Sequence, residues 1–328
     1  MPASPPVLAQ DALAAALAEL GEASLDVRVL EETGSTNGDL VQAVHSGAVT
    51  RPCVIAARHQ TEARGRLERS WAAPRDSSLL LSVFLSPEHL HADGDPHALR
   101  SPDASSTRRS SAFETATDAL GLLPLAVGAA AVETVRRETG VRAELKWPND
   151  VLVGGRKLAG ILCQLTPHRG GLGIVAGVGL NVAQSRDELP VDRATSLALE
   201  GSESVDPNRL AAALVAAILR RSRTVLVDRD LASIASLMST VGSRVRVERV
   251  AEDPSQDVVG TATGLAPDGG LIVVREDGVT ETVHAGDVWH LRDAEAPRTP
   301  PSAGSAPVGA RPAGTQPGRE ADRQEAGA

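Results

Sequence analysis

The stretch LKWPNDVLVGGRKLAGILCQL at residues 145–165 decides the fold, because apolar runs of strand length alternate in it with tight turns. PND and GG are turn signals, so the pattern predicts strands around 141–153 and 157–165 joined by short connections. The stretch also contains the only two lysines, Lys146 and Lys157, among 33 Lys and Arg residues. An ammonium is a compact point charge, whereas a guanidinium is a planar fork of donors. We therefore predict that this stretch carries a functional site as well as strands.

The composition is typical of a soluble globular protein. The chain has 328 residues, of which 42% are hydrophobic and 23% charged, enough for one large domain and a small one. A formal net charge of −9 argues against a general nucleic-acid binder, so we expect no DNA partner. The sequence has no signal peptide and no apolar run of about 18 residues, which predicts no membrane partner and a cytoplasmic location. Cys53 and Cys163 form neither a metal-ligand spacing nor a disulfide framework.

Periodicity predicts the remaining elements. Residues 28–37 indicate a strand that enters a polar turn, 38–47 a short helix, and 53–58 and 78–85 further strands. Residues 91–121 are rich in Ser, Asp, Thr and Arg, which predicts a disordered insertion or a long surface loop.

In the second half of the chain, the spacing of apolar residues predicts further helices and strands. We predict an amphipathic helix at 122–139, a glycine-rich buried strand at 171–182, and helices at 207–226 and 229–240. From 241 the period becomes two, which predicts a small β-barrel or sandwich. The expected organisation is an N-terminal extension with a short helix at 1–27, a main domain at 28–240, a small β domain at 241–292 and a disordered tail at 293–328.

A basic stretch, HQTEARGRLERSW at 59–71, is a candidate anion site. Arg64, Arg66 and Arg69 flank Gly65 in a segment with too little apolar content to pack by itself. Guanidinium groups on such a loop suit the capture of a phosphate or a carboxylate through bidentate, charge-assisted bonds. A solvated charged loop is the alternative interpretation of the same pattern.

Two further segments contain candidate residues. Asn149 and Asp150 occupy a turn, where Asp150 suits a magnesium ion that also binds substrate phosphates, although plain turn chemistry explains the pair equally. In GVGLNV, Gly177, Gly179 and Asn181 share one face of a strand, which allows a flat ligand or another backbone to approach closely. Together these residues favour phosphoryl or adenylyl chemistry on a small carboxylate.

Four stretches resemble the signature motifs of biotin protein ligases. They are TGSTN (33–37), QTEARGRLERSW (60–71), KWPNDVLVGGRKLAGIL (146–162) and GVGLNV (177–182), and they occur in the order that the family has. The resemblance covers residues 28–292 apart from the insertion at 91–121. It implies an α+β fold in which a mixed β-sheet with helices, related to class II synthetases and lipoate ligases, precedes a small SH3-like β-barrel.

The resemblance also implies a reaction. Biotin and ATP are the substrates, with Mg²⁺, and the carboxylate of biotin attacks the α-phosphate to give biotinyl-5′-adenylate and pyrophosphate. A lysine on the biotin carboxyl-carrier domain of an acyl-CoA or pyruvate carboxylase then takes the biotinyl group and releases AMP.

The matched positions imply a role for each candidate residue. Those matched to biotin are Ser35, Thr36, Asn37, Gln60, Arg64, Gly65, Arg66, Lys157, Gly160, Gly177 and Gly179. Those matched to ATP are Arg64, Arg66, Arg69, Trp71, Lys146, Asn149, Lys157 and Asn181. Lys157, Arg66 and Lys146 are the candidate catalytic residues, and Asp150 is the candidate magnesium ligand.

This chain departs from the family pattern at two positions. Ala63 replaces the usual glycine before Arg-Gly-Arg, and Glu68 adds a negative charge to the loop. Only about thirty residues precede the first motif, so the sequence favours a ligase without a DNA-binding repressor domain. A lipoate or octanoate ligase and a non-catalytic biotin-binding regulator are the alternatives, although KWPND, RKLAG and Arg-Gly-Arg are all present.

Overall fold

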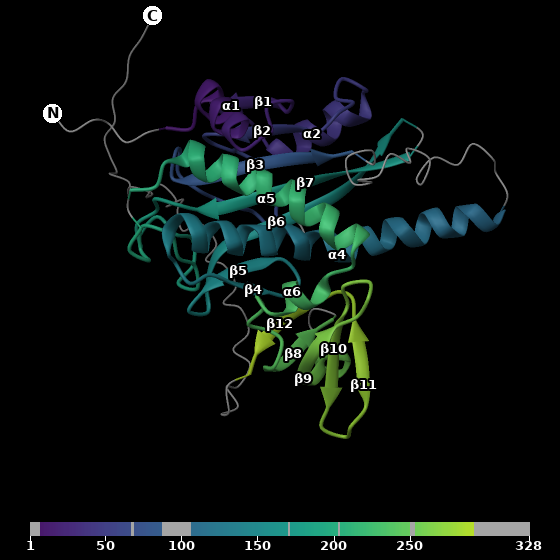
Figure 1. The fold of residues 1–328 in the computed structure, drawn as a ribbon. Helices are drawn as coiled ribbons and strands as arrows, with labels where there is room; N and C mark the ends of the chain where they lie inside the picture. The colour runs from purple at the N-terminus through teal and green to yellow at the C-terminus, as the bar shows by residue number, and fades with distance from the viewer. Residues whose placement is uncertain are drawn as a thin grey trace, which may run out of the picture. The chain divides into compact units, whose positions relative to one another are not determined.

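The computed structural model describes residues 7–66, 69–86, 106–169, 171–202, 204–249 and 253–291 (Figure 1). The described residues all belong to one compact unit, Met1–Arg292. The tail predicted at 293–328 and residue Glu68 lie outside the described residues.

The larger of two sheets is mixed and has seven strands. Their order is β1-β2-β3-β7-β6-β5-β4, and only the β1–β2 pair is parallel. Its strands are β1 (Asp26–Leu30), β2 (Cys53–Ala57), β3 (Ser78–Leu85), β4 (Glu144–Lys146), β5 (Asp150–Val153), β6 (Arg156–His168) and β7 (Gly171–Asn181). The predicted mixed sheet is therefore confirmed.

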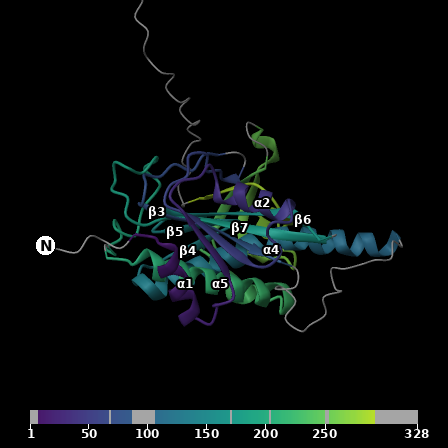
Figure 2. The same ribbon diagram turned by 90° about the horizontal axis from the view of Figure 1, so that it is seen from above.

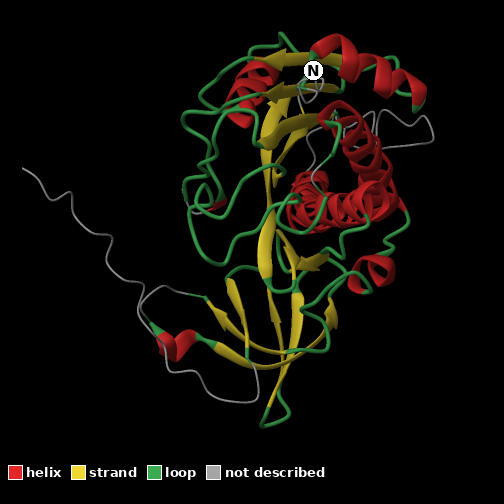
Figure 3. Ribbon diagram, turned by 90° about the vertical axis from the view of Figure 1, so that its left-hand side faces the viewer, coloured by secondary structure: helices red, strands yellow, loops and turns green. Residues whose placement is uncertain are grey.

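Helices cover both faces of this sheet (Figures 2 and 3). The α-helices in the described residues are α1 (Gln10–Glu19), α2 (Thr36–His45), α4 (Ser106–Thr139), α5 (Pro207–Val227) and α6 (Leu231–Ala235). Strand β3 lies between the two helical layers, since Leu81 belongs to the main core while Phe84 packs with Leu40 of α2. Burial on both faces explains why the sequence SLLLSVFL is apolar almost without interruption.

Helix α1 is an integral part of the main domain, although the sequence placed it in an extension at 1–27. Leu13 and Leu17 are buried in the main core. The Asn208 side chain on α5 accepts from Ala9 N–H at 2.9 Å and donates to the Val7 carbonyl at 3.0 Å. The sequence predicted the short helix, but its partner on α5 lies about two hundred residues away, where no local pattern reports it.

The sequence predicted a disordered insertion or a long surface loop at 91–121, and this prediction was wrong for residues 106–121. Helix α4 begins at Ser106, so residues 106–121 are helical, while 91–105 lie outside the described residues. The segment contains good helix formers and no proline, and it adjoins the buried helical segment at 122–139. Extending an existing helix adds one hydrogen bond per residue without a new nucleus, so a polar composition does not prevent it.

The smaller sheet confirms the predicted β-rich region after residue 241. It is antiparallel, with the order β11-β10-β9-β8-β12. Its strands are β8 (Arg244–Glu248), β9 (Val258–Leu265), β10 (Leu271–Arg275), β11 (Thr280–Val283) and β12 (Asp287–His290), and a short 3₁₀ helix, η2 (Pro254–Gln256), precedes β9. No helix in the described part of the chain is long and apolar enough to cross a membrane.

Trp147 joins the two sheets. Its indole Nε1 donates to the Gly269 carbonyl at 3.0 Å, and its backbone N–H donates to Thr240 Oγ1 at 3.1 Å. The side chain is 2% exposed and belongs to the same core cluster as Val245 of β8. The two sheets thus share one hydrophobic core, with no solvent layer between them at this point.

We expect Trp147→Phe to lower the free energy of unfolding by about 1–3 kcal/mol, because the Gly269 carbonyl would lose its buried donor. Urea denaturation of the full chain measures the change. Trp289→Phe is the matched control, since Trp289 is 42% exposed and should change stability by less than about 0.5 kcal/mol. Equal losses in the two variants would contradict a structural role for the Trp147 bond.

Candidate functional site

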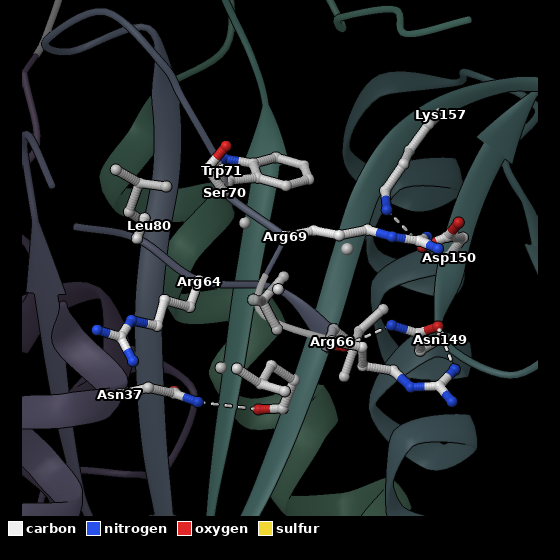
Figure 4. Close-up of a pocket in the computed structure, with 18 of the residues that line it drawn as sticks. Asn37, Arg64, Arg66, Arg69, Ser70, Trp71, Leu80, Asn149, Asp150 and Lys157 are labelled. Atoms are coloured by element: carbon white, nitrogen blue, oxygen red, sulfur yellow. Dashed lines mark hydrogen bonds and ion pairs between the residues drawn. The ribbon is translucent and has the colours of Figure 1, made fainter. Parts of the chain in front are cut away.

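A pocket of about 370 Å³ opens above β3, β7, β6 and β5 (Figure 4). All the residues singled out from the sequence line it: Ser35, Thr36, Asn37, Gln60, Arg64, Gly65, Arg66, Arg69, Trp71, Lys146, Asn149, Asp150, Lys157, Gly160, Gly177, Gly179 and Asn181. Their positions span the chain from 35 to 181, so the fold gathers separate motifs into one site. Their individual roles remain predictions.

A chain of hydrogen-bonded polar groups occupies one end of the pocket. Gln60 Oε1 accepts from the Thr36 backbone N–H at 2.7 Å, and Thr36 Oγ1 lies 2.8 Å from Ser82 Oγ. Ser82 donates to Asn37 Oδ1 at 2.6 Å, and Asn37 Nδ2 donates to Gln164 Oε1 at 2.9 Å. The chain holds several amide and hydroxyl groups at fixed positions, as a small polar ligand requires.

Local structure explains how this end forms. Ser35 is the N-cap of α2, and its side chain accepts from Gly38 N–H at 3.3 Å. The cap places Thr36 and Asn37 in the first turn of the helix, where they point over the sheet. A parallel bridge between Thr33 and Gln60 aligns the two motifs that meet here.

Glycines form the floor of the pocket. A Cβ atom at Gly177 would lie 2.2 Å from Asn37 Oδ1, so the asparagine occupies the space that a side chain would need. Gly160 and Gly179 are paired across β6 and β7, and a Cβ atom at either one would lie 3.1 Å or less from the Trp71 ring. Within the described residues, Trp71 Nε1 is buried and has no hydrogen-bond partner, so a donor remains for a ligand.

Cationic groups occupy the other end. Lys157 Nζ lies 2.6 Å from Asp150 Oδ1 and 5.7 Å from the centre of the Trp71 ring. Arg66 donates to Asn149 Oδ1 at 3.2 Å (Figure 4). Burial lowers the pKa of Arg66, which shows that its guanidinium has lost part of its solvation in the pocket.

Lys146 is the more buried of the two lysines. Desolvation lowers the pKa of its ammonium below the ordinary 10.5, and the positive charges of Lys157 and Arg193 act in the same direction. Asp150, its register partner on β5, and Asp287 oppose this effect. At Lys146 the effect of burial therefore outweighs the nearby carboxylates, which leaves a poorly solvated ammonium in the pocket.

Ser82 and Asp287 are polar lining residues that the sequence analysis did not single out. Ser82 lies within an apolar run, where a single serine resembles ordinary strand variation. Asp287 comes from β12 in the small sheet and forms an ion pair with Arg69. No sequence signal marked Asp287, because its partner lies 218 positions away.

The departure at position 63 has no structural cost in the backbone. Ala63 does not adopt a positive φ, so alanine fits where the family has glycine. Its carbonyl accepts from Trp71 N–H at 3.0 Å, and this bond joins the two ends of the arginine loop (residues 64–71).

Asn181 lines the pocket, but its side-chain amide already donates to the Thr195 carbonyl at 2.9 Å.

The fold and the pocket define a class of protein, the biotin and lipoate ligases. Residues 29–181 match the Biotin/lipoate A/B protein ligase family, and residues 240–291 match the Biotin protein ligase C terminal domain. The boundaries agree with the main sheet and with the small sheet.

Sequence identity to individual relatives shows which family within this class the chain belongs to. The chain is 37% identical to the biotin--[acetyl-CoA-carboxylase] ligase of Mycobacterium tuberculosis over 276 residues, 80% of this chain and 88% of that one. It is 29% identical to the bifunctional ligase/repressor BirA of Escherichia coli, over 82% of this chain and 75% of the relative. The chain therefore belongs to the biotin protein ligase family, which confirms the resemblance seen in its motifs.

The solved structure of the Aquifex aeolicus biotin protein ligase in complex with biotin and ATP has the same fold. It superposes with a TM-score of 0.61 at 24% sequence identity, over 81% of this chain and 99% of that one. The predicted α+β architecture is confirmed by this match.

We expect the Lys146 ammonium to titrate below pH 10.5, its ordinary value, because burial disfavours the charged form. Selective ¹³C-lysine labelling of the full chain gives signals from only two side chains, which NMR can follow against pH. The Lys146→Arg variant assigns the signals, and circular dichroism checks that the chain stays folded. A midpoint at or above 10.5 would contradict the burial of this group.

Proposed function

We propose that this chain is an ATP-dependent biotin–protein ligase that forms biotinyl-5′-AMP and transfers biotin to a lysine of a carboxyl-carrier domain. One observation carries the proposal: a single pocket joins a fixed polar cluster, a glycine floor and a set of lysines and arginines. This arrangement suits a flat polar ring at one end and a triphosphate at the other.

The polar end suits the ureido ring of biotin. That ring offers two N–H donors and one carbonyl acceptor, which match the amide and hydroxyl groups of Thr36, Asn37 and Gln60. Ser35 supports this end as the cap of α2. The bare backbone at Gly160 and Gly177 lets the Trp71 ring and the Asn37 side chain lie close against the sheet, where both line the pocket that would hold the ligand.

The cationic end suits ATP. Lys157 stabilises the negative charge that develops on the α-phosphate when the biotin carboxylate attacks it. Its present partner, Asp150, must release it first. Lys146 and Arg66, both held in the pocket with lowered pKa values, gain most from a phosphate because their charges are poorly solvated.

The arginine loop covers the reaction. Arg64 and Gly65 lie at its start and Trp71 at its end, and all three line the pocket together with Arg69 and with Asn149 of the PND turn, the residues that would contact the nucleotide. Closing this loop over a mixed anhydride excludes water, which would otherwise hydrolyse the intermediate.

Magnesium fits the site as a companion of ATP. The described residues contain no group of three or more His, Cys, Asp or Glu that could hold a metal ion alone. Asp150 would supply a carboxylate oxygen and the phosphates would supply others, as is common for Mg²⁺. The ion would neutralise charge on the triphosphate.

The second step needs a partner. The ε-amine of a lysine on the biotin carboxyl-carrier domain of an acyl-CoA or pyruvate carboxylase attacks the activated carbonyl and displaces AMP. We place this reaction in the cytoplasm, because Cys53 and Cys163 are both free thiols, as in a reducing compartment.

A first experiment omits the acceptor. The purified chain is incubated with MgATP and biotin, lipoate or octanoate in turn, and pyrophosphate release and bound acyl-adenylate are measured. We expect a burst of about one equivalent with biotin only. A burst with lipoate or octanoate instead would indicate the related ligases, and tight biotin binding without adenylate would indicate a regulator.

Lys157→Arg should slow adenylate formation by about 10²-fold while biotin still binds, because a planar guanidinium cannot occupy the position of a compact ammonium. Single-turnover kinetics measure the rate, and calorimetry measures biotin affinity. Arg244→Lys, in an exposed ion pair with Glu276 of the small sheet, is the control and should leave both unchanged. Near-normal turnover in Lys157→Arg would remove the assigned role.

A further inference from the structure

A segment outside the sheet is bonded directly to the backbone of Lys157. Lys157 N–H donates to the Arg193 carbonyl at 2.6 Å, and Thr195 N–H donates to the Lys157 carbonyl at 2.8 Å. These two bonds form a parallel bridge between Lys157 and Ala194. The segment 193–195 therefore fixes the backbone from which the Lys157 ammonium extends.

A buried network of amides and hydroxyls holds this segment. Asn181 Nδ2 donates to the Thr195 carbonyl at 2.9 Å, and Gln184 Nε2 donates to Asn181 Oδ1 at 3.1 Å. Gln184 Nε2 also donates to Ser78 Oγ at 2.5 Å, while Ser196 Oγ donates to the Gln184 carbonyl at 2.6 Å. Asn181 is 4% exposed and Gln184 is 1% exposed, so both amides are enclosed by protein.

Further bonds tie the segment from its outer side. Thr195 Oγ1 donates to Glu200 at 2.5 Å, and Glu200 also accepts from Arg156 at 2.8 Å. Arg186 donates to the Ala194 carbonyl at 2.8 Å. Side chains from β7 and from the following loop thus bond Ala194 and Thr195 directly, and Arg156 of β6 holds Glu200 in place.

The hydrogen bonds of Asn181 limit what else it can do. Turning its amide toward a nucleotide would leave the Thr195 carbonyl without its side-chain donor, and the Gln184 amide would keep Ser78 Oγ but lose the Asn181 oxygen as an acceptor. An unsatisfied buried polar group is costly, so the observed arrangement favours an internal role for this side chain.

We propose that Asn181 and Gln184 are positioning residues, which hold segment 193–195 against Lys157, and that Asn181 is not a ligand of the nucleotide. The inference rests on the proposed role of Lys157 in adenylate formation. A cation that stabilises a transition state must be fixed before the reaction, and a displacement of about 1 Å can reduce the rate about 10²-fold.

The structural part of the proposal can be tested without activity. Labelling the full chain with ¹⁵N-lysine gives only two backbone amide signals, those of Lys146 and Lys157, and their hydrogen exchange can be measured. Asn181→Ala and Gln184→Met should accelerate exchange of the Lys157 amide at least about tenfold, because its acceptor at Arg193 is released. Unchanged exchange at Lys157 in both variants would overturn the proposal.

Asn208→Ala is the matched control for losing a buried asparagine. Asn208 of α5 is 6% exposed and bonds the backbone of Val7 and Ala9 just before α1, and none of these three residues lines the pocket. We expect no change in exchange at Lys157 in this variant. Equal acceleration in Asn208→Ala would reveal general destabilisation and would also overturn the proposal.

Kinetics separate positioning from nucleotide binding. Gln184 does not line the pocket, yet both Gln184→Met and Asn181→Ala should lower the adenylation rate at saturating ATP about 10–100-fold, with the KM for ATP unchanged. In a Lys157→Arg background the further loss should be much smaller, because the residues act as one unit. A raised KM for ATP in Asn181→Ala alone would identify a nucleotide contact and reject positioning.

A native chain that forms no adenylate would reject the proposed function, while the exchange experiment would still decide whether Asn181 holds Lys157.

Discussion

The site depends on the absence of side chains at the centre of one strand pair. Gly160 lies opposite Gly179 in the register of β6 and β7, and Gly177 follows on the same face. Asn37 and Trp71 occupy the space that Cβ atoms would take there. Because side chains alternate along a strand, a register slip of one residue would turn this bare face away from the pocket. The pairing of β6 with β7 is therefore both the centre of the fold and the condition for a ligand site.

The charges above this floor form a second constraint. Lysines and arginines gather in a partly buried space, where like charges repel and lose hydration. Asp150 and Asp287 compensate part of this charge through ion pairs with Lys157 and Arg69. Burial nevertheless lowers the pKa of Lys146, so its ammonium is poorly solvated. A triphosphate would supply a charged partner for it, and its binding would involve an exchange of ion-pair partners in the pocket.

Much of this arrangement could be predicted from the sequence, and the parts that could not share one property. Strands with a nearly continuous apolar run, such as β3, and motifs with several fixed residues, such as that around Lys157, are local patterns. Ser82 bonds Thr36, 46 positions away, and Asp287 pairs with Arg69, 218 positions away. The packing of α1 and the start of α4 depend likewise on distant or adjoining structure. A single sequence predicts the role of a residue when that role depends on its neighbours in the chain. It does not predict the role when that depends on contacts with residues far away in the sequence.

The small sheet also contributes to the site, through contacts between residues that are far apart in the sequence. It reaches the main domain at three separate places: Gly269 accepts from Trp147, the Trp289 ring lies 5.0 Å from the Arg193 guanidinium, and Asp287 pairs with Arg69. These contacts join the small sheet to the PND turn, to the segment that holds Lys157 and to the arginine loop. Each of these elements also borders the pocket through its own residues. The four sequence motifs are thus necessary for the pocket but do not complete it, because strand β12 supplies the carboxylate against which the arginine loop is held.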